Sequence, residues 1–79
     1  MNKSDFNVQS HRIEPYVLID ELSENEIYIG TSNSFSDRAR PTWRIKRIIK
    51  IGTVWQMEYP DGNQDFSFIW NNRFAYSYR

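Results

Sequence analysis

The sequence predicts an all-β domain of antiparallel strands, and three observations support this class. Apolar and polar residues alternate along "TWRIKRIIKI" (42–51) and "TVWQMEY" (53–59), with the period of a strand that buries one face. The chain carries three Trp, five Tyr and five Phe, residue types that favour strands. Turn signals such as Gly30, Gly52 and "YPDG" (59–62) separate the apolar stretches.

The first two strands are expected at 16–22 and 26–32. In the first, Tyr16, Leu18 and Leu22 share one face, although Glu and Leu leave a helix over 18–26 as an alternative. The second, "EIYIGTS", closes at Gly30. The stretch 33–41 combines Asn, Ser and Asp with a proline and is expected to be a loop.

The third strand, 42–51, has an interrupted alternation. One parity holds Trp43, Ile45, Arg47, Ile49 and Ile51, so a charged residue stands in an apolar row. The other parity is basic and is interrupted by Ile48. Because exchanging the parities of Arg47 and Ile48 would restore the pattern, we expect a β-bulge near 47–48.

The remaining strands are expected at 53–59, 66–70 and 73–78. The first is predicted to bury a core row of Trp55, Met57 and Tyr59, and to end in a type I turn with Gly62 in a left-handed conformation. The last two should form a hairpin joined at Asn71-Asn72. The expected facing rows are Phe66, Phe68 and Trp70, and Phe74, Tyr76 and Tyr78.

Short strands, tight turns and the absence of a long helical pattern predict a small antiparallel β-barrel or sandwich of SH3-like or OB-like size. We assign this domain to residues 16–79. Residues 1–15 are polar, with isolated apolar positions, and are interpreted as an extended arm.

Ten basic and ten acidic residues cancel, but they are segregated along the chain. The early part is acidic and the middle is basic, the latter through Arg38, Arg40, Arg44, Lys46, Arg47 and Lys50. The first ten residues lack the apolar run of a signal peptide, and no stretch reaches the roughly 20 apolar residues of a membrane span. We expect a soluble chain made in the cytoplasm, without membrane contacts.

Catalytic and metal chemistry find little support in the sequence. His11 is the only histidine and there is no cysteine, so neither a triad nor a histidine-cysteine metal site can be assembled. "DGNQD" (61–65) lacks the spacing and the final glutamate of an EF-hand, and the glycines are isolated. We therefore predict a protein that is not an enzyme, with no metal, cofactor or small-molecule substrate.

Two groups of residues are candidates for partner binding. Arg44, Lys46 and Lys50 should project from one face of a strand, with Arg38 and Arg40 on the loop before it, an arrangement that would suit single-stranded nucleic acid. A solvated face or a protein-docking patch explains the same residues, and the acidic residues of a neighbouring strand would then balance them. The chain also has more aromatic residues than a small interior encloses. The expected protein contacts are therefore Trp43, Arg44, Lys46, Lys50, Tyr76, Tyr78 and, on the arm, Phe6.

Four motifs taken together resemble a group of short tailed-phage proteins. They are "YIG" (28–30), "PTWRIKRI" (41–48), "YPDG" (59–62) and "FSFIWNNR…YSY" (66–78), and they cover roughly residues 26 to 78. Phe66 and Trp70 keep the Phe-x-x-x-Trp spacing of that group, and Asn71-Asn72 precedes Arg73 where an acidic or amide pair is usual. The resemblance implies a shared fold and a place in the virion or tail region, and it supplies no catalytic residues.

The expectation from residues and resemblance together is a non-enzymatic structural or adaptor protein of the virion, as a capsid decoration, neck or tail component. Its partners would be other virion proteins or copies of itself. Two alternatives stay open: a small barrel that binds single-stranded nucleic acid, and a small phage inhibitor of a host protein.

Overall fold

The computed structural model describes residues 16–32 and 37–79. The predicted arm, and with it Phe6, lies outside the described residues. The elements are β1 (Tyr16–Ser23), β2 (Glu26–Ser32), β3 (Pro41–Ile51), β4 (Val54–Glu58), β5 (Phe68–Ile69) and the short 3-10 helix η3 (Trp70–Asn72).

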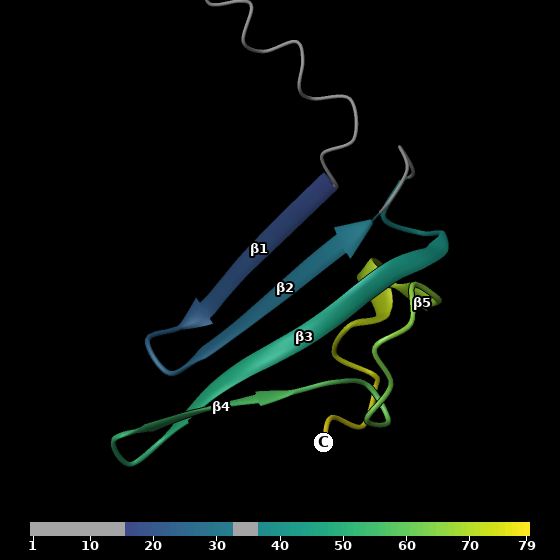
Figure 1. Ribbon diagram of the computed structural model, residues 1–79. Helices are drawn as coiled ribbons and strands as arrows, with labels where there is room; N and C mark the ends of the chain where they lie inside the picture. The colour runs from purple at the N-terminus through teal and green to yellow at the C-terminus, as the bar shows by residue number, and fades with distance from the viewer. Residues whose placement is uncertain (1–15, 33–36) are drawn as a thin grey trace, which may run out of the picture.

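The strands form one antiparallel sheet in the order β1-β2-β3-β4, and β5 pairs with the beginning of β3 (Figure 1). The predicted all-β antiparallel class is therefore confirmed. Among the described residues β1 pairs with β2 alone and β4 with β3 alone. The sheet of the described chain is thus open along both outer strands, and no pairing closes it into a barrel.

Two positive backbone angles mark the turns that the glycines predict. Gly52, with φ of 66°, joins β3 to β4, and Gly62 has φ of 71°. Asp61 also has a positive φ of 52°, and Asn63 N–H donates to the Pro60 carbonyl at 2.8 Å. Positive φ at both central residues belongs to the type I′ turn, so the expected type I geometry is wrong although the left-handed glycine is confirmed.

The register of β3 is continuous through Arg47. Pairs run without a shift from Glu26↔Ile49 to Ser32↔Trp43 on one side of β3, and from Arg47↔Glu58 to Ile51↔Val54 on the other. The predicted bulge near 47–48 is therefore wrong. Arg47 stays in the same row as Ile45 and Ile49, because Glu58 and Glu26 lie beside it and balance its charge.

Because opposite residues of antiparallel strands share a face, the register divides the sheet into two faces. One face, called the covered face below, lies under the C-terminal segment. Its core consists of Tyr28, Trp43, Ile45 and Trp70, each at most 4% exposed, with Leu18, Phe68, Tyr76 and Tyr78 packed around them. Besides these four, the fully buried side chains of the described residues are those of Pro60 and Ser32, so the interior is small.

Gly30 makes this packing possible. It lies on β2 between the indoles of Trp43 and Trp70, and a Cβ added there would collide with the Trp70 ring. The two indole centroids are 6.3 Å apart. The glycine that was predicted to close the second strand therefore leaves room for the Trp70 ring of the C-terminal segment to lie against the sheet.

The predicted final hairpin is wrong. β5 has two residues, η3 follows at once, and Tyr78 makes a single bridge to Pro60. Internal hydrogen bonds hold this segment: the Ile69 N–H donates to the Tyr76 hydroxyl at 2.9 Å, and the Tyr78 hydroxyl donates to the Arg73 carbonyl at 2.8 Å. The aromatic residues alternate in sequence, but the segment after β5 runs beside the sheet and does not add a hairpin to it (Figure 1). Phe68, Tyr76 and Tyr78 of this segment pack around the core.

The predicted core row on β4 is also wrong. Trp55 is 47% exposed and Met57 is 55% exposed, although they alternate as expected. The register places them opposite Lys50 and Ile48, on the face away from the core. Alternation identifies the two rows of a strand, but it does not say which row is covered.

Candidate functional site

The face of the sheet opposite the core, called the open face below, is formed by all four long strands. In register, Val17, Thr31 and Arg44 form one row, and Ile19, Ile29 and Lys46 form the next. The remaining rows are Glu21, Ile27, Ile48 and Met57, and then Lys50 and Trp55. Four strands therefore contribute to one continuous surface.

The centre of the open face is apolar and accessible. Val17 is 52% exposed and Ile19 65%, while Ile27, Ile29 and Ile48 are half-buried between them and Met57. β-Branched side chains are favoured in strands whether or not a layer covers them, so propensity explains their presence but not their exposure. Large contiguous apolar surfaces on soluble proteins typically mark interaction sites.

Three cations lie among these apolar side chains. Arg44, Lys46 and Lys50 alternate along β3, and the strands place one carboxylate, Glu21, on the same face. The Arg44 guanidinium lies 4.9 Å from the Phe66 ring centroid, and the Lys50 ammonium lies 5.7 Å from that of Trp55. No ion pair within the described residues joins any of the three to an acid. The open face is thus apolar with a positive charge.

Two of the acidic residues that were expected to balance this face, Asp20 and Glu26, lie on the covered face instead. Asp20 accepts hydrogen bonds from Arg73 Nε and Nη2 at 3.1 and 2.9 Å, which ties β1 to the C-terminal segment. Glu26 lies 3.6 Å from Arg47 and accepts a 2.8 Å hydrogen bond from the Tyr28 hydroxyl. These carboxylates stabilise the fold through their pairs on the covered face. They therefore do not neutralise the positive charge of the open face.

Arg47, Glu58 and Tyr28 form a half-buried polar cluster at the edge of the core. Arg47 donates to Glu58 Oε1 from Nε at 3.0 Å and also from Nη2. This hydrogen bonding holds the pKa of Glu58 below its ordinary value, against the opposing effect of burial. Burial, together with the hydrogen bond to Glu26, raises the pKa of Tyr28, so its hydroxyl remains a donor. Burial also raises the pKa of Tyr78, whose ring lies 5.3 Å from the Arg47 guanidinium.

The Glu58 pair predicts a pH dependence of stability. A carboxylate whose folded pKa is lowered stabilises the fold above its unfolded pKa, near 4.5, and loses this contribution as the pH falls through the lower folded value. We expect Glu58→Gln to be less stable than the parent at about pH 7, and the difference to shrink by about pH 3. Thermal unfolding followed by circular dichroism measures this, and a pH-independent difference would contradict it.

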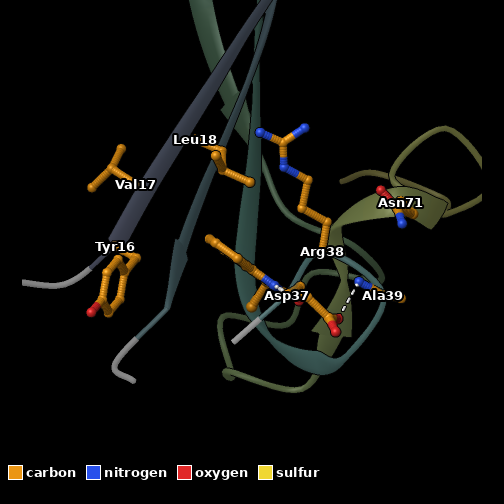
Figure 2. Close-up of a pocket in the computed structure, with 8 residues that line it drawn as sticks. Tyr16, Val17, Leu18, Asp37, Arg38, Ala39 and Asn71 are labelled. Carbon is orange, nitrogen blue, oxygen red and sulfur yellow. Dashed lines mark hydrogen bonds between the residues drawn. The ribbon is translucent and has the colours of Figure 1, made fainter. Parts of the chain in front are cut away.

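A cavity of about 490 Å³ lies on the covered face beside the outer strand β1. Figure 2 shows Tyr16 and Leu18 of β1 on one side of it and Arg38, Ala39 and Asn71 on the other. Trp43 also lines it, while its indole N–H donates to the Asp37 carbonyl at 3.0 Å. The cavity is open and mainly apolar, and no set of convergent acids, bases or nucleophiles lines it. It supports binding of an apolar side chain more readily than a reaction.

The predicted contact residues divide into three groups. Arg44, Lys46 and Lys50 come together on the open face, and Arg38 and Arg40 are exposed in the turn before β3. Trp43 is 2% exposed, so its expected role as a partner contact is corrected to a core role. Tyr76 and Tyr78 are half-buried, with hydroxyls bonded inside the chain.

Sequence reasoning missed the apolar part of the open face, formed by Val17, Ile19, Ile27, Ile29, Ile48 and Met57. The sequence did carry a signal for this surface, because the second row of alternate positions in each strand also holds apolar residues. Both rows of β2 are apolar, for example, with Ile27 and Ile29 on one side and Tyr28 on the other. Only the register shows that these second rows adjoin.

No helix of the described chain has the length and apolar character needed to cross a bilayer. Within residues 16–32 and 37–79, no three His, Asp or Glu side chains gather as a group that would hold a metal ion. No protein-family model, curated protein or solved structure matches the chain significantly.

Proposed function

We propose that this chain is a non-enzymatic protein-docking module, and that it serves as a structural or adaptor component of a phage virion. The open face is its binding surface. The observation that carries the proposal is the accessible apolar centre shared by four strands, with Ile19 at 65% exposure and Met57 at 55%. The virion setting is supported by the resemblance of residues 26–78 to short tailed-phage proteins.

The charges of the open face indicate the chemistry of its partner. Three cations and one carboxylate surround the apolar centre, so a complementary surface would be apolar in the middle and acidic at its margin. A second copy docked by the same face would bring six cations together with two carboxylates. The partner on this face is therefore a different protein surface.

The small core is consistent with a protein that works while bound. Only Tyr28, Trp43, Ile45 and Trp70 make up the buried apolar core of the described chain. A domain of this size has a narrow stability margin, and a partner that binds only the folded state stabilises it by mass action. Burial of the open face in an assembly would add the apolar contacts that the isolated chain lacks.

Proteomic analysis of purified virions tests the virion assignment. We expect this chain in particles purified from the culture that produces it, in constant proportion to the major capsid protein through successive density gradients. Its absence from such particles while it is abundant in the lysate would overturn the virion assignment and favour the inhibitor of a host protein.

Nucleic-acid binding is the second candidate, because Trp55 is exposed beside Lys50 and would offer a base a stacking surface. The aliphatic centre of the open face argues against it, since bases stack on aromatic rings. A fluorescent oligothymidylate titrated with the chain at low salt should show no binding. Salt-sensitive binding that is lost in Arg44→Glu/Lys46→Glu/Lys50→Glu would instead establish this candidate.

A further inference from the structure

A second, smaller cavity adjoins the apolar cavity on the covered face. It has a volume of about 220 Å³ and a mainly polar lining, made by Leu18, Ile19, Asp20, Arg38, Trp70 and Arg73. Leu18 and Arg38 line this polar cavity and the apolar cavity of about 490 Å³ as well. The two cavities therefore meet at these two side chains, and one ligand can occupy both.

The junction of the two cavities carries the positive charge of one guanidinium. Four charged side chains of the described chain line the cavities, and Asp20 accepts two hydrogen bonds from Arg73. Asp37 Oδ1 accepts a 2.9 Å hydrogen bond from the Ala39 N–H. No ion pair within residues 16–32 and 37–79 engages Arg38. Figure 2 shows the Arg38 side chain extending toward β1, whereas the Asp37 carboxylate lies beside Ala39.

The turn that carries Arg38 is held in place by its backbone. The Arg38 carbonyl accepts a 3.0 Å hydrogen bond from the Asn71 N–H of η3, and the Asp37 carbonyl accepts one from the Trp43 indole. These bonds fix the turn against η3 and β3. A ligand would thus meet walls that are already formed, and walls formed in advance lower the entropic cost of binding.

We propose that the two cavities bind the C-terminal residue of a partner protein, with its apolar side chain in the apolar cavity and its carboxylate on Arg38. An engineered cavity of roughly 150 Å³ holds benzene, so a cavity of about 490 Å³ has room for an aromatic side chain. The side chain and carboxylate of a terminal residue leave the same Cα, and the two cavities likewise adjoin. Guanidinium groups bind carboxylates through paired hydrogen bonds, and capture of a terminal carboxylate is a recurring mode of peptide recognition.

A ligand with two negative charges fits this site less well. Asp20 and Asp37 also line the cavities and would repel the second charge of a phosphate group. A single carboxylate balances the charge of Arg38. The apolar cavity is open on one side, so the preceding residues of a partner chain can leave it.

The site goes beyond the proposed function, because it lies on the covered face and not on the open face. Leu18 packs against the core, and Trp43 is part of it. A partner terminus at this site and a partner surface on the open face can therefore bind at the same time. Failure of the test below would leave the proposed role of the open face unchanged.

Nuclear magnetic resonance of the full chain tests the site, because the Trp43 indole N–H reports on the cavity wall. We expect N-acetyl-Gly-Gly-Phe with a free carboxylate to shift the Trp43 indole signal and to leave the signal of Trp55, on the open face, in place. The same peptide with a C-terminal amide should bind at least about tenfold more weakly, because it lacks the charge that Arg38 pairs. No shift of the Trp43 signal at millimolar concentrations of the free acid would overturn the proposal.

Two variants test the contact with the carboxylate. Arg38→Gln changes an exposed residue, so we expect a folded chain that binds the free acid about tenfold more weakly and the amide unchanged. Arg40→Gln is the matched control, since Arg40 is exposed in the same turn and lines neither cavity. Equal effects of the two substitutions would overturn the role of Arg38. Phenylacetate offers the same two groups without a peptide, and tighter binding of phenylacetate than of the peptide would overturn the partner terminus as the ligand.

Discussion

Replacement of Trp70 by alanine is expected to destabilise the fold by about 3–5 kcal/mol, which approaches the whole stability of a domain this small. The Trp70 side chain is 4% exposed, and its indole fills the space above Gly30 beside Trp43. Its loss leaves a cavity in a core of four residues. The Arg73 guanidinium, 4.5 Å from the Trp70 ring centroid, would also lose its stacking surface. Chemical denaturation followed by circular dichroism measures the change.

Trp55→Ala is the matched control, because it removes the same side chain from the other face of the sheet. Trp55 is 47% exposed and contacts Lys50 at the surface, so we expect a change within about 0.5 kcal/mol. Equal losses of stability in Trp55→Ala and Trp70→Ala would mean that Trp55 is packed as tightly as a core residue. That result would contradict the division of the sheet into a covered and an open face.

Gly30→Val is expected to destabilise the chain by about 1–3 kcal/mol, even though valine favours strands. The new Cβ would collide with the Trp70 ring and lie 3.3 Å from the Trp43 ring. Neither indole can move without disturbing the other. The expected signs are a lower unfolding midpoint and a weaker near-ultraviolet signal from the tryptophans.

Two variants show whether this loss comes from the contact with Trp70. Thr31→Val, at the next position of β2, places valine on the open face in exchange for a side chain of similar volume and should change stability by no more than about 0.5 kcal/mol. The double variant Gly30→Val/Trp70→Phe should lose less stability than the two single variants lose together, because the smaller phenylalanine ring leaves room for the Cβ. Strict additivity would contradict the steric account.

The first four strands were predictable from local patterns, because their boundaries coincide with turn chemistry. Predictions at 16–22, 26–32 and 42–51 lie within one residue of β1, β2 and β3, and Gly52 and Gly62 adopt the left-handed conformations that the turns require. These features depend on residues that are close in sequence. Alternation and glycine placement are sufficient to identify them.

The choice of the covered face was not predictable from local patterns, because a remote segment determines it. Trp55 and Met57 have the same alternation as Trp43 and Ile45, yet only the second pair is buried. The difference arises because Trp70, Tyr76 and Tyr78 of the C-terminal segment pack against the core residues of β2 and β3 on the covered face. Arg47 was misjudged for a related reason, since its partner Glu58 is brought to it by pairing with β4.

The candidate site was half visible in the sequence. Arg44, Lys46 and Lys50 were identified from their parity, and the register confirms that they share a face. The apolar centre that makes this face a docking surface depends on the adjacency of Ile19, Ile29 and Ile48, which come from three strands. Such adjacency requires knowledge of the pairing.

Hydroxyl-radical footprinting of the chain, free and within purified particles, tests the central claim most directly, because methionine and the aromatic residues are the side chains that react readily. Met57 and Trp55 lie on the open face, while Phe74, 58% exposed, packs against Tyr28 on the other side of the sheet. We predict that oxidation of Met57 and Trp55 falls sharply in the particle while that of Phe74 persists. Undiminished oxidation of Met57 and Trp55 in the particle would contradict the assignment of the open face as the docking surface.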